Sequence, residues 1–126
     1  MNLKCIKTKN APEPIGPYSQ AVESNNFIFT SGQIAIKPST GQLLNGNVQE
    51  QTRLVLDNLK SVLSAAGSGM DQIVKTTIYL NNMDDFPQVN AVYSEYFTDS
   101  FPARSTVEVS RLPKNVLVEI DCIAAK

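Results

Sequence analysis

Apolar residues recur at helical spacing in one long stretch of the chain, formed by Thr52, Val55, Leu56, Leu59, Val62, Leu63 and Ala66. Asn47 is a good N-cap residue before this stripe, and Glu50, three residues later, can complete a capping box. Gly67 can adopt the positive φ that ends a helix. The pattern therefore predicts a helix over residues 47–66.

A second helix is predicted over residues 84–97. Asp84 and Asp85 suit its N-terminal end, and Pro87 is acceptable in its first turn. Its apolar face consists of Phe86, Val89, Tyr93, Tyr96 and Phe97. Asn90 lies on that same face. Because an unpaired buried amide costs about 1–3 kcal/mol, we expect Asn90 to have a hydrogen-bond partner.

The remaining periodic segments predict strands over residues 4–8, 21–23, 27–34, 73–80, 103–109 and 117–125. The turn Ser24-Asn25-Asn26 predicts a hairpin between two of them. The order of strands and helices indicates a single α+β domain over residues 1–126. We expect a six-stranded mixed sheet with both helices packed on one face.

The alternation along the last two strands assigns their faces. In the final strand the apolar residues Val118, Ile120 and Cys122 alternate with Glu119, Asp121 and Ile123. In the strand before it, Arg104, Thr106 and Glu108 share one face. We expect Arg104 and Glu119 to lie together on the face that the helices leave uncovered. The mixed character of that face favours contact with another subunit, and hence a homo-oligomer.

Composition narrows the function classes. The 126 residues are 42% hydrophobic and 18% charged, which is typical of a globular domain. The net charge of −1, without a basic run, argues against a nucleic-acid or polybasic membrane surface. No apolar stretch approaches the roughly 20 residues of a membrane span. The N-terminus also lacks an apolar signal core, so we expect a cytoplasmic protein.

The chain contains no His, which excludes His-based triads, His general bases and His-ligated zinc. Cys5 and Cys122 lie outside any C-x-x-C spacing and are interpreted as small buried hydrophobic residues. Neither a phosphate-binding loop nor a dinucleotide-binding fingerprint occurs. We expect no metal and no cofactor, so an enzyme of this composition would use Arg, carboxylates, hydroxyls and backbone groups.

Two segments could present ligand-binding groups on loops. Residues 11–20 carry three prolines and a glycine, which can hold Tyr18 in place, although a rigid surface connection explains the spacing better. Gly32 interrupts a strand-like run, which indicates a bulge or a close approach to its backbone. Its N–H and the Ser31 hydroxyl are candidate donors, while a bulge without function is an equal alternative.

Two further segments carry charges. Arg104 follows Pro102 into a strand, where its guanidinium could bind a carboxylate bidentately or pair with an acid across a subunit boundary. Glu119 in a half-buried strand could act as a base with a raised pKa, or could pair with Arg104. The pattern indicates a carboxylate-binding pocket with one candidate base.

Six segments, in order and at compatible spacing, resemble the YjgF-type reactive intermediate deaminases, the RidA family. They are Ile15-Gly16-Pro17-Tyr18, Thr30-Ser31-Gly32-Gln33, Asp85-Phe86 with Val89-Asn90, Phe101-Pro102-Ala103-Arg104-Ser105, Leu112-Pro113 and Val118-Glu119-Ile120. The resemblance implies a fold like that of trimeric chorismate mutase and a homotrimer with ligand sites in clefts between subunits. It also implies hydrolysis of 2-imino acids, such as 2-iminobutanoate and 2-iminopropanoate, to 2-keto acids and ammonia. This reaction would protect pyridoxal-phosphate enzymes from reactive intermediates.

The resemblance assigns a role to each matching residue. Arg104 would bind the substrate carboxylate, and Glu119 would activate the attacking water or pass a proton to the leaving nitrogen. Tyr18 and Ser31 would line the cleft, with the Gly32 backbone near the substrate. Because an imine hydrolyses unaided, orientation and one proton-handling group suffice, without metal or cofactor.

The resemblance also gives Asn90 a role, and it shows one departure from the family, at Thr106. Asn90 would support the pocket wall, which explains a polar residue on the second helix. Thr106 stands where many family members have Cys, so a mechanism that needs a thiolate is excluded here.

Two alternatives come from other classes of protein. One is a ribonuclease or translation inhibitor, as some family members have been described, although the near-neutral charge weakens it. The other is a non-catalytic regulatory module that binds small carboxylates through Arg104.

Overall fold

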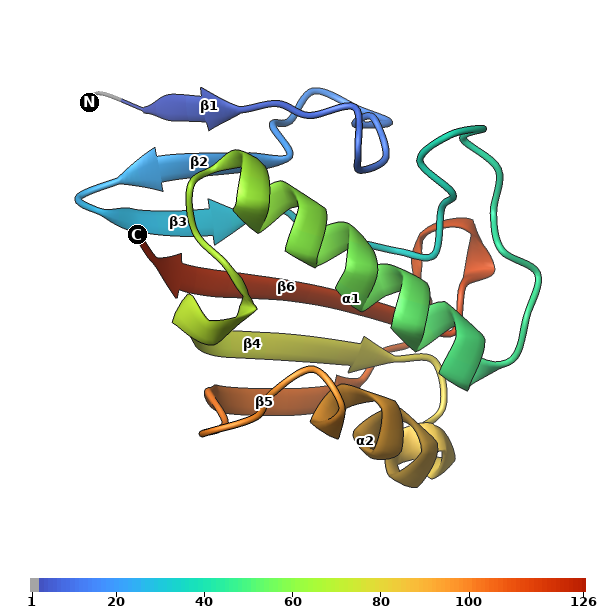
Figure 1. Ribbon diagram of the computed structural model, residues 1–126. Helices are drawn as coiled ribbons and strands as arrows, with labels where there is room; N and C mark the ends of the chain where they lie inside the picture. Colours follow the sequence, from blue (N-terminus) through green and yellow to red (C-terminus); the bar gives the residue numbers. More distant parts are fainter. Residues whose placement is uncertain (1–2) are drawn as a thin grey trace.

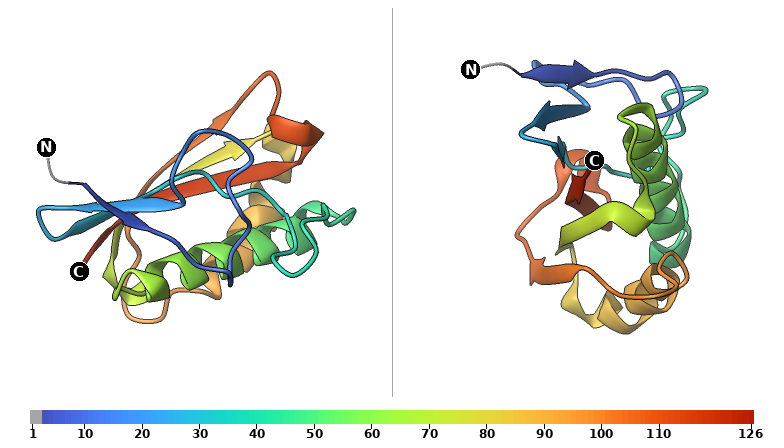
Figure 2. Two further views of the ribbon diagram at one scale, coloured as in Figure 1. Left: turned by 90° about the horizontal axis from the view of Figure 1, so that it is seen from above. Right: turned by 60° about the vertical axis from the view of Figure 1, so that its left-hand side comes forward.

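The computed structural model describes residues 3–126. It has two layers, a six-stranded mixed sheet and two α-helices that cover one of its faces (Figures 1 and 2), which confirms the predicted α+β class. The strands are β1 (Lys4–Ile6), β2 (Ala21–Ser24), β3 (Phe27–Thr30), β4 (Ile73–Leu80), β5 (Ala103–Glu108) and β6 (Val118–Ala125). The helices are α1 (Val48–Ala65) and α2 (Phe86–Ser94), with short 3-10 helices at Met70–Gln72, Met83–Asp85 and Pro113–Asn115.

The strand order across the sheet is β1-β2-β3-β6-β4-β5. All neighbours are antiparallel except β4 and β5, which are parallel and connected through α2. The turn between β2 and β3 places Asn25 and Asn26 at positive φ, as a tight hairpin requires, so the predicted hairpin is confirmed.

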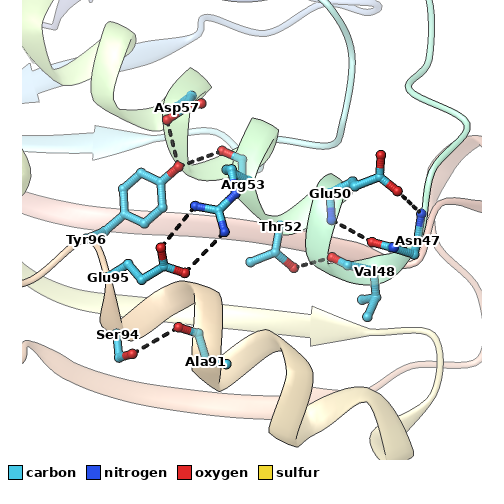
Figure 3. A network of polar contacts seen from close by, with 10 residues as sticks. All are labelled: Asn47, Val48, Glu50, Thr52, Arg53, Asp57, Ala91, Ser94, Glu95 and Tyr96. Atoms are coloured by element: carbon cyan, nitrogen blue, oxygen red, sulfur yellow. Dashed lines mark hydrogen bonds and ion pairs between the residues drawn. The ribbon is translucent and has the colours of Figure 1, made fainter.

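Helix α1 begins and ends as its sequence predicts. The Asn47 side chain accepts a hydrogen bond from the Glu50 N–H at 2.8 Å, and the Glu50 carboxylate accepts one from the Asn47 N–H at 3.1 Å (Figure 3). Gly67 has a φ of 79°, and the N–H of Ser68 donates to the Leu63 carbonyl. The apolar stripe of α1 lies against the sheet.

Helix α2 is shorter than the predicted 84–97 because both of its ends are built differently. The chain enters through the 3-10 turn Met83–Asp85, capped by the Asn82 side chain, which accepts from the Asp84 N–H. Beyond Ser94 the chain bends toward α1. There Glu95 pairs with Arg53 at 3.1 Å, and the Tyr96 hydroxyl donates to the Asp57 carboxylate at 2.7 Å (Figure 3).

Strand β3 ends at Thr30, earlier than the predicted residue 34. The Ser31 N–H donates to the Gln20 carbonyl, which turns the chain at this point, and pairing with β6 resumes only in an isolated bridge between Gln33 and Ile120. Gly32 therefore lies in a break of the strand.

The main core fills the space between the helices and the sheet. Along β6 it buries Val118, Ile120 and Cys122, while Glu119 and Asp121 lie on the face that no helix covers. We call this second surface the open face. Cys122 is buried as predicted, whereas Cys5 on the edge strand β1 is exposed, which corrects the expectation for that residue. Within residues 3–126, neither α-helix is long and apolar enough to cross a lipid bilayer.

Candidate functional site

A cleft of about 440 Å³ lies where β3 ends beside the connection from β1 to β2. We call it the Glu119 cleft. Its lining consists of Pro12, Glu13, Ile15, Tyr18, Gln20, Thr30, Ser31, Gly32, Gln33, Ile34, Ile36, Pro113, Glu119 and Asp121. The structure thus brings together four of the residues that the sequence singled out, namely Tyr18, Ser31, Gly32 and Glu119.

Glu119 extends from the middle of the sheet onto the open face and is half-buried. Burial raises the pKa of its carboxyl above the ordinary value, and the nearby Asp121 carboxylate raises it further. Asp121 accepts a hydrogen bond from the Tyr79 hydroxyl at 3.1 Å. A carboxylate that is harder to ionise is a better proton acceptor, so this environment is suitable for a general base.

Gly32 approaches this carboxylate so closely that any side chain there would displace the Glu119 carboxyl group. A Cβ at Gly32 would lie 2.8 Å from Glu119 Cδ and 3.1 Å from Glu119 Cγ. Of the two interpretations left open by the sequence, the structure therefore supports a close approach. The approaching group belongs to the same chain.

Tyr18 and Ser31 belong to the rim of the Glu119 cleft. The Tyr18 hydroxyl accepts a hydrogen bond from the Ile15 N–H at 3.1 Å, which fixes the ring over its own loop. The Ser31 hydroxyl donates to the Ser19 carbonyl at 2.6 Å. That proton therefore holds two loops together, so the Ser31 hydroxyl faces a ligand as an acceptor and not as the donor that the sequence analysis expected.

Arg104 lies on the helix-covered side of the sheet, which corrects the expectation that it shares a face with Glu119. Strands β4 and β5 pair in register, with Thr76 opposite Arg104 and Ile78 opposite Thr106. Thr76 and Ile78 are both buried beneath the helices, so Arg104 and Thr106 are on that side too. Arg104 therefore cannot pair with Glu119 of the same chain, and the ion pair that the sequence offered as one alternative does not form within one chain.

A second, smaller cavity of about 320 Å³ surrounds Arg104. We call it the Arg104 pocket, and its lining consists of Asn90, Tyr93, Ser94, Phe101, Pro102 and Arg104. Asn90 is half-buried at this pocket, and its side chain makes no hydrogen bond within residues 3–126, against the expectation of a partner. The buried Thr106 hydroxyl likewise has no hydrogen-bond partner in the part of the chain that the structure describes.

The Arg104 guanidinium lies 5.0 Å from the ring centre of Tyr93 and 5.3 Å from that of Phe86. Both aromatic residues were predicted only as part of the apolar face of the second helix, because aromatic residues at helical spacing are typical of a buried helix face. Their spacing contains no signal for a contact with Arg104. The position of Arg104 on the neighbouring strand depends on sheet pairing, which the local pattern does not contain.

No group of three or more His, Cys, Asp or Glu residues within residues 3–126 is close enough to hold a metal ion. The candidate functional residues lie in two separate places. The Glu119 cleft supplies a carboxylate, and the Arg104 pocket supplies a guanidinium.

The chain is similar to known proteins in both sequence and structure. The family model described as Endoribonuclease L-PSP matches residues 8–126. A RutC family protein of Pyrococcus horikoshii is 55% identical over 121 residues, 96% of each chain. The 2-iminobutanoate/2-iminopropanoate deaminase of Escherichia coli is 49% identical over 126 residues, 98% of each chain. The crystal structure of Escherichia coli TdcF with bound serine is 43% identical, with a TM-score of 0.93 over 98% of each chain.

Proposed function

The chain belongs to the endoribonuclease L-PSP family, to which the YjgF-type proteins belong, and from that premise we propose that it is an imine deaminase. Its substrates would be 2-imino acids such as 2-iminobutanoate and 2-iminopropanoate. Its products would be the 2-oxo acids and ammonia. The relative named for this reaction in Escherichia coli supports the proposal, since it matches nearly the whole chain.

The observation that carries the proposal is the division of the chemistry between two faces of one sheet. A small imino acid needs a partner for its carboxylate and a base near its imine carbon. This chain offers Arg104 on the helix side, at the edge strand β5, and Glu119 on the open face. One small molecule cannot touch both in a single chain, so we propose that a complete site forms between two copies, in a homotrimer.

The open face supports contact with a second copy. Phe27, Phe29 and Val107 lie on it and are each a little over 40% exposed. Phe27 and Phe29 lie on β3, whereas Val107 lies on β5 with β6 and β4 between them. Exposed apolar side chains on one sheet face favour an interaction surface, and burying them provides about 25 cal/mol per Å².

In the proposed reaction Arg104 binds the substrate carboxylate through two parallel N–H bonds. Glu119 takes a proton from a water molecule, whose oxygen attacks the imine carbon. The carbon–nitrogen π electrons move to the nitrogen of the protonated imine, giving a neutral carbinolamine. Glu119 returns its proton to that nitrogen, which becomes an ammonium group. The Glu119 carboxylate then takes the proton of the hydroxyl group, the carbon–oxygen double bond forms as the carbon–nitrogen bond breaks, and the ammonia carries that proton away as ammonium. One water is consumed for each ammonia released.

The remaining residues would shape the site. Tyr18 would line it, and the Gly32 N–H and the Ser31 oxygen would face the substrate from the Glu119 side. Asn90 and Thr106 would do so from the Arg104 side, where each has a polar group without a partner within residues 3–126. We propose that the protein works in the cytoplasm without metal or cofactor, and that it protects pyridoxal-phosphate enzymes.

The test measures the release of 2-oxobutanoate from 2-iminobutanoate. A threonine dehydratase generates the imine in the assay mixture, and semicarbazide is present to trap free imine. We expect the wild type to outcompete the trap and Arg104→Ala to match buffer. Glu119→Gln should bind 2-oxobutanoate but turn over at least about 100-fold more slowly, as loss of a general base does. Equal rates for wild type and buffer would contradict the deaminase.

Turnover that survives in Glu119→Gln would instead contradict the role of that carboxylate. Binding of 2-oxobutanoate without any turnover by the wild type would support the carboxylate-binding module. A labelled single-stranded RNA incubated with the same preparation tests the ribonuclease alternative, which the family's description also names.

A further inference from the structure

Arg104 is held by contacts with aromatic rings. Its guanidinium carbon lies 5.0 Å from the centre of the Tyr93 ring and 5.3 Å from that of Phe86, both on α2. Within residues 3–126 no acidic side chain pairs with it and no carbonyl accepts from it. A guanidinium that stacks on rings through its flat face keeps its N–H groups at the edge, where a carboxylate can bind them bidentately.

The Tyr93 ring is itself fixed at its far end. Its hydroxyl lies 2.8 Å from the Thr76 hydroxyl, in a hydrogen bond buried from solvent. Thr76 on β4 is the in-register neighbour of Arg104 on β5. The hydrogen bond therefore ties the ring from α2 to the strand beside the one that carries Arg104, so ring and guanidinium are held to the same part of the sheet.

The Tyr93 hydroxyl is poorly suited to proton transfer. Tyr93 is 3% exposed, and burial raises the pKa of its phenol above the ordinary value, so the group stays protonated. Its one polar atom is already occupied by Thr76. What remains for Tyr93 to contribute is the face of its ring.

We propose that Tyr93, tethered by Thr76, is a positioning residue that holds the Arg104 guanidinium in one orientation for a carboxylate ligand. The identity of that ligand as a 2-imino or 2-oxo acid rests on the proposed function. The orientation of Arg104 does not, so the two can fail separately.

The first readout needs no ligand. Protons over an aromatic ring resonate upfield, so in ¹⁵N-labelled protein the Arg104 Nε–H signal, assigned by its loss in Arg104→Lys, should be shifted upfield. Tyr93→Leu should move this signal toward the position of a free arginine. Tyr93→Phe retains the ring but loses the tether to Thr76, so it should move the signal only partway. Val92→Ala, a truncation at another buried position of α2, is the matched control and should not move it.

The second readout is the affinity for 2-oxobutanoate by calorimetry. Tyr93→Leu should weaken binding about tenfold, within the range for a partly desolvated cation–π contact. Tyr93→Phe keeps the ring without the tether and should rescue part of that loss, as Thr76→Val should retain part of the affinity. In turnover, Tyr93→Leu should raise KM by a similar factor while kcat changes less than about twofold, because the base and the water are untouched.

An unmoved Nε–H signal in Tyr93→Leu, or an equal movement in Val92→Ala, would overturn the proposal. If Tyr93→Leu does not fold, Thr76→Val keeps the side-chain shape and removes only the tether. It should then move the signal partway, and an unchanged signal would again overturn the proposal. A wild type that shows the upfield signal but no turnover would contradict the deaminase while supporting the positioning of Arg104.

Discussion

At Gly32 a hydrogen atom stands where any other residue would place a carbon against the Glu119 carboxyl group. The atoms in the way are the far end of a flexible side chain, which can swing aside. A methyl group at this position should therefore cost little stability but displace the candidate base.

We expect Gly32→Ala to lower kcat by about 100-fold, the typical effect of a misplacement of about 1 Å, with KM nearly unchanged. The measurement is steady-state turnover of 2-iminobutanoate, together with thermal unfolding to confirm the fold. Because Gly32 would act through Glu119, Gly32→Ala combined with Glu119→Gln should be no slower than Glu119→Gln alone. Additive losses would show that Gly32 has a separate role.

At this scale the sequence pointed to Gly32 because a glycine that interrupts a strand-like run indicates a bulge or a close approach. The group that approaches it, the Glu119 carboxyl, lies on β6 and could not be identified from the local pattern. The aromatic neighbours of Arg104 were missed because the contact joins α2 to β5, and the spacing of Phe86 and Tyr93 along their own helix is equally typical of a plain core face.

Among the helices and strands, α1 is the element whose two ends are best predicted from nearby residues. Both ends are fixed by side chains or backbone conformations within a few residues, through Asn47, Glu50 and Gly67. The ends of α2 and β3 could not be placed in this way. Tyr96 hydrogen-bonds to α1 and Ser31 to the preceding loop, so both boundaries depend on tertiary contacts.

Replacing Asn47 by Ala should lower the free energy of unfolding by about 1 kcal/mol, because the N-cap acceptor and its reciprocal partner are lost together. Urea unfolding at one fixed chain concentration measures this change. Gln49→Ala, at an exposed neighbouring position of the same helix, is the control and should stay within about 0.5 kcal/mol of wild type. Turnover should be unchanged in both variants, and a loss in Asn47→Ala would contradict a purely structural role for the cap.

For the whole molecule, the central observation is that Arg104 and Glu119 lie on opposite faces of the sheet. The alternation along β5 and β6 was identified correctly, but Arg104 and Glu119 were placed on the same face. Alternation separates the residues of one strand into two faces. It does not show which of these two sets lies on the same side of the sheet as a given set on another strand. Only the in-register parallel pairing of β4 with β5 shows that Arg104 shares the buried side with Thr76.

A site shared between copies makes a quantitative prediction. Arg104→Ala and Glu119→Gln chains should each be inactive alone, but mixed assemblies formed by co-expressing them in equal amounts should regain about one quarter of wild-type turnover. Each site then has a chance of one half of receiving an intact Arg104, and one half of receiving an intact Glu119. Arg104→Ala paired with the double variant is the control and should regain nothing. No recovery in the first mixture would place both groups in one chain.

The opposite-face placement of Arg104 and Glu119 also has a consequence for how such a protein responds to dilution. If each site needs two chains, a fully folded single chain contains no complete site and is inactive. The association equilibrium then sets the specific activity. Activity per chain would then fall as the total concentration drops below the dissociation constant of the assembly, although the helices and the sheet stay intact. The amount of protein in a cell would determine both how many sites exist and what fraction of chains belong to one.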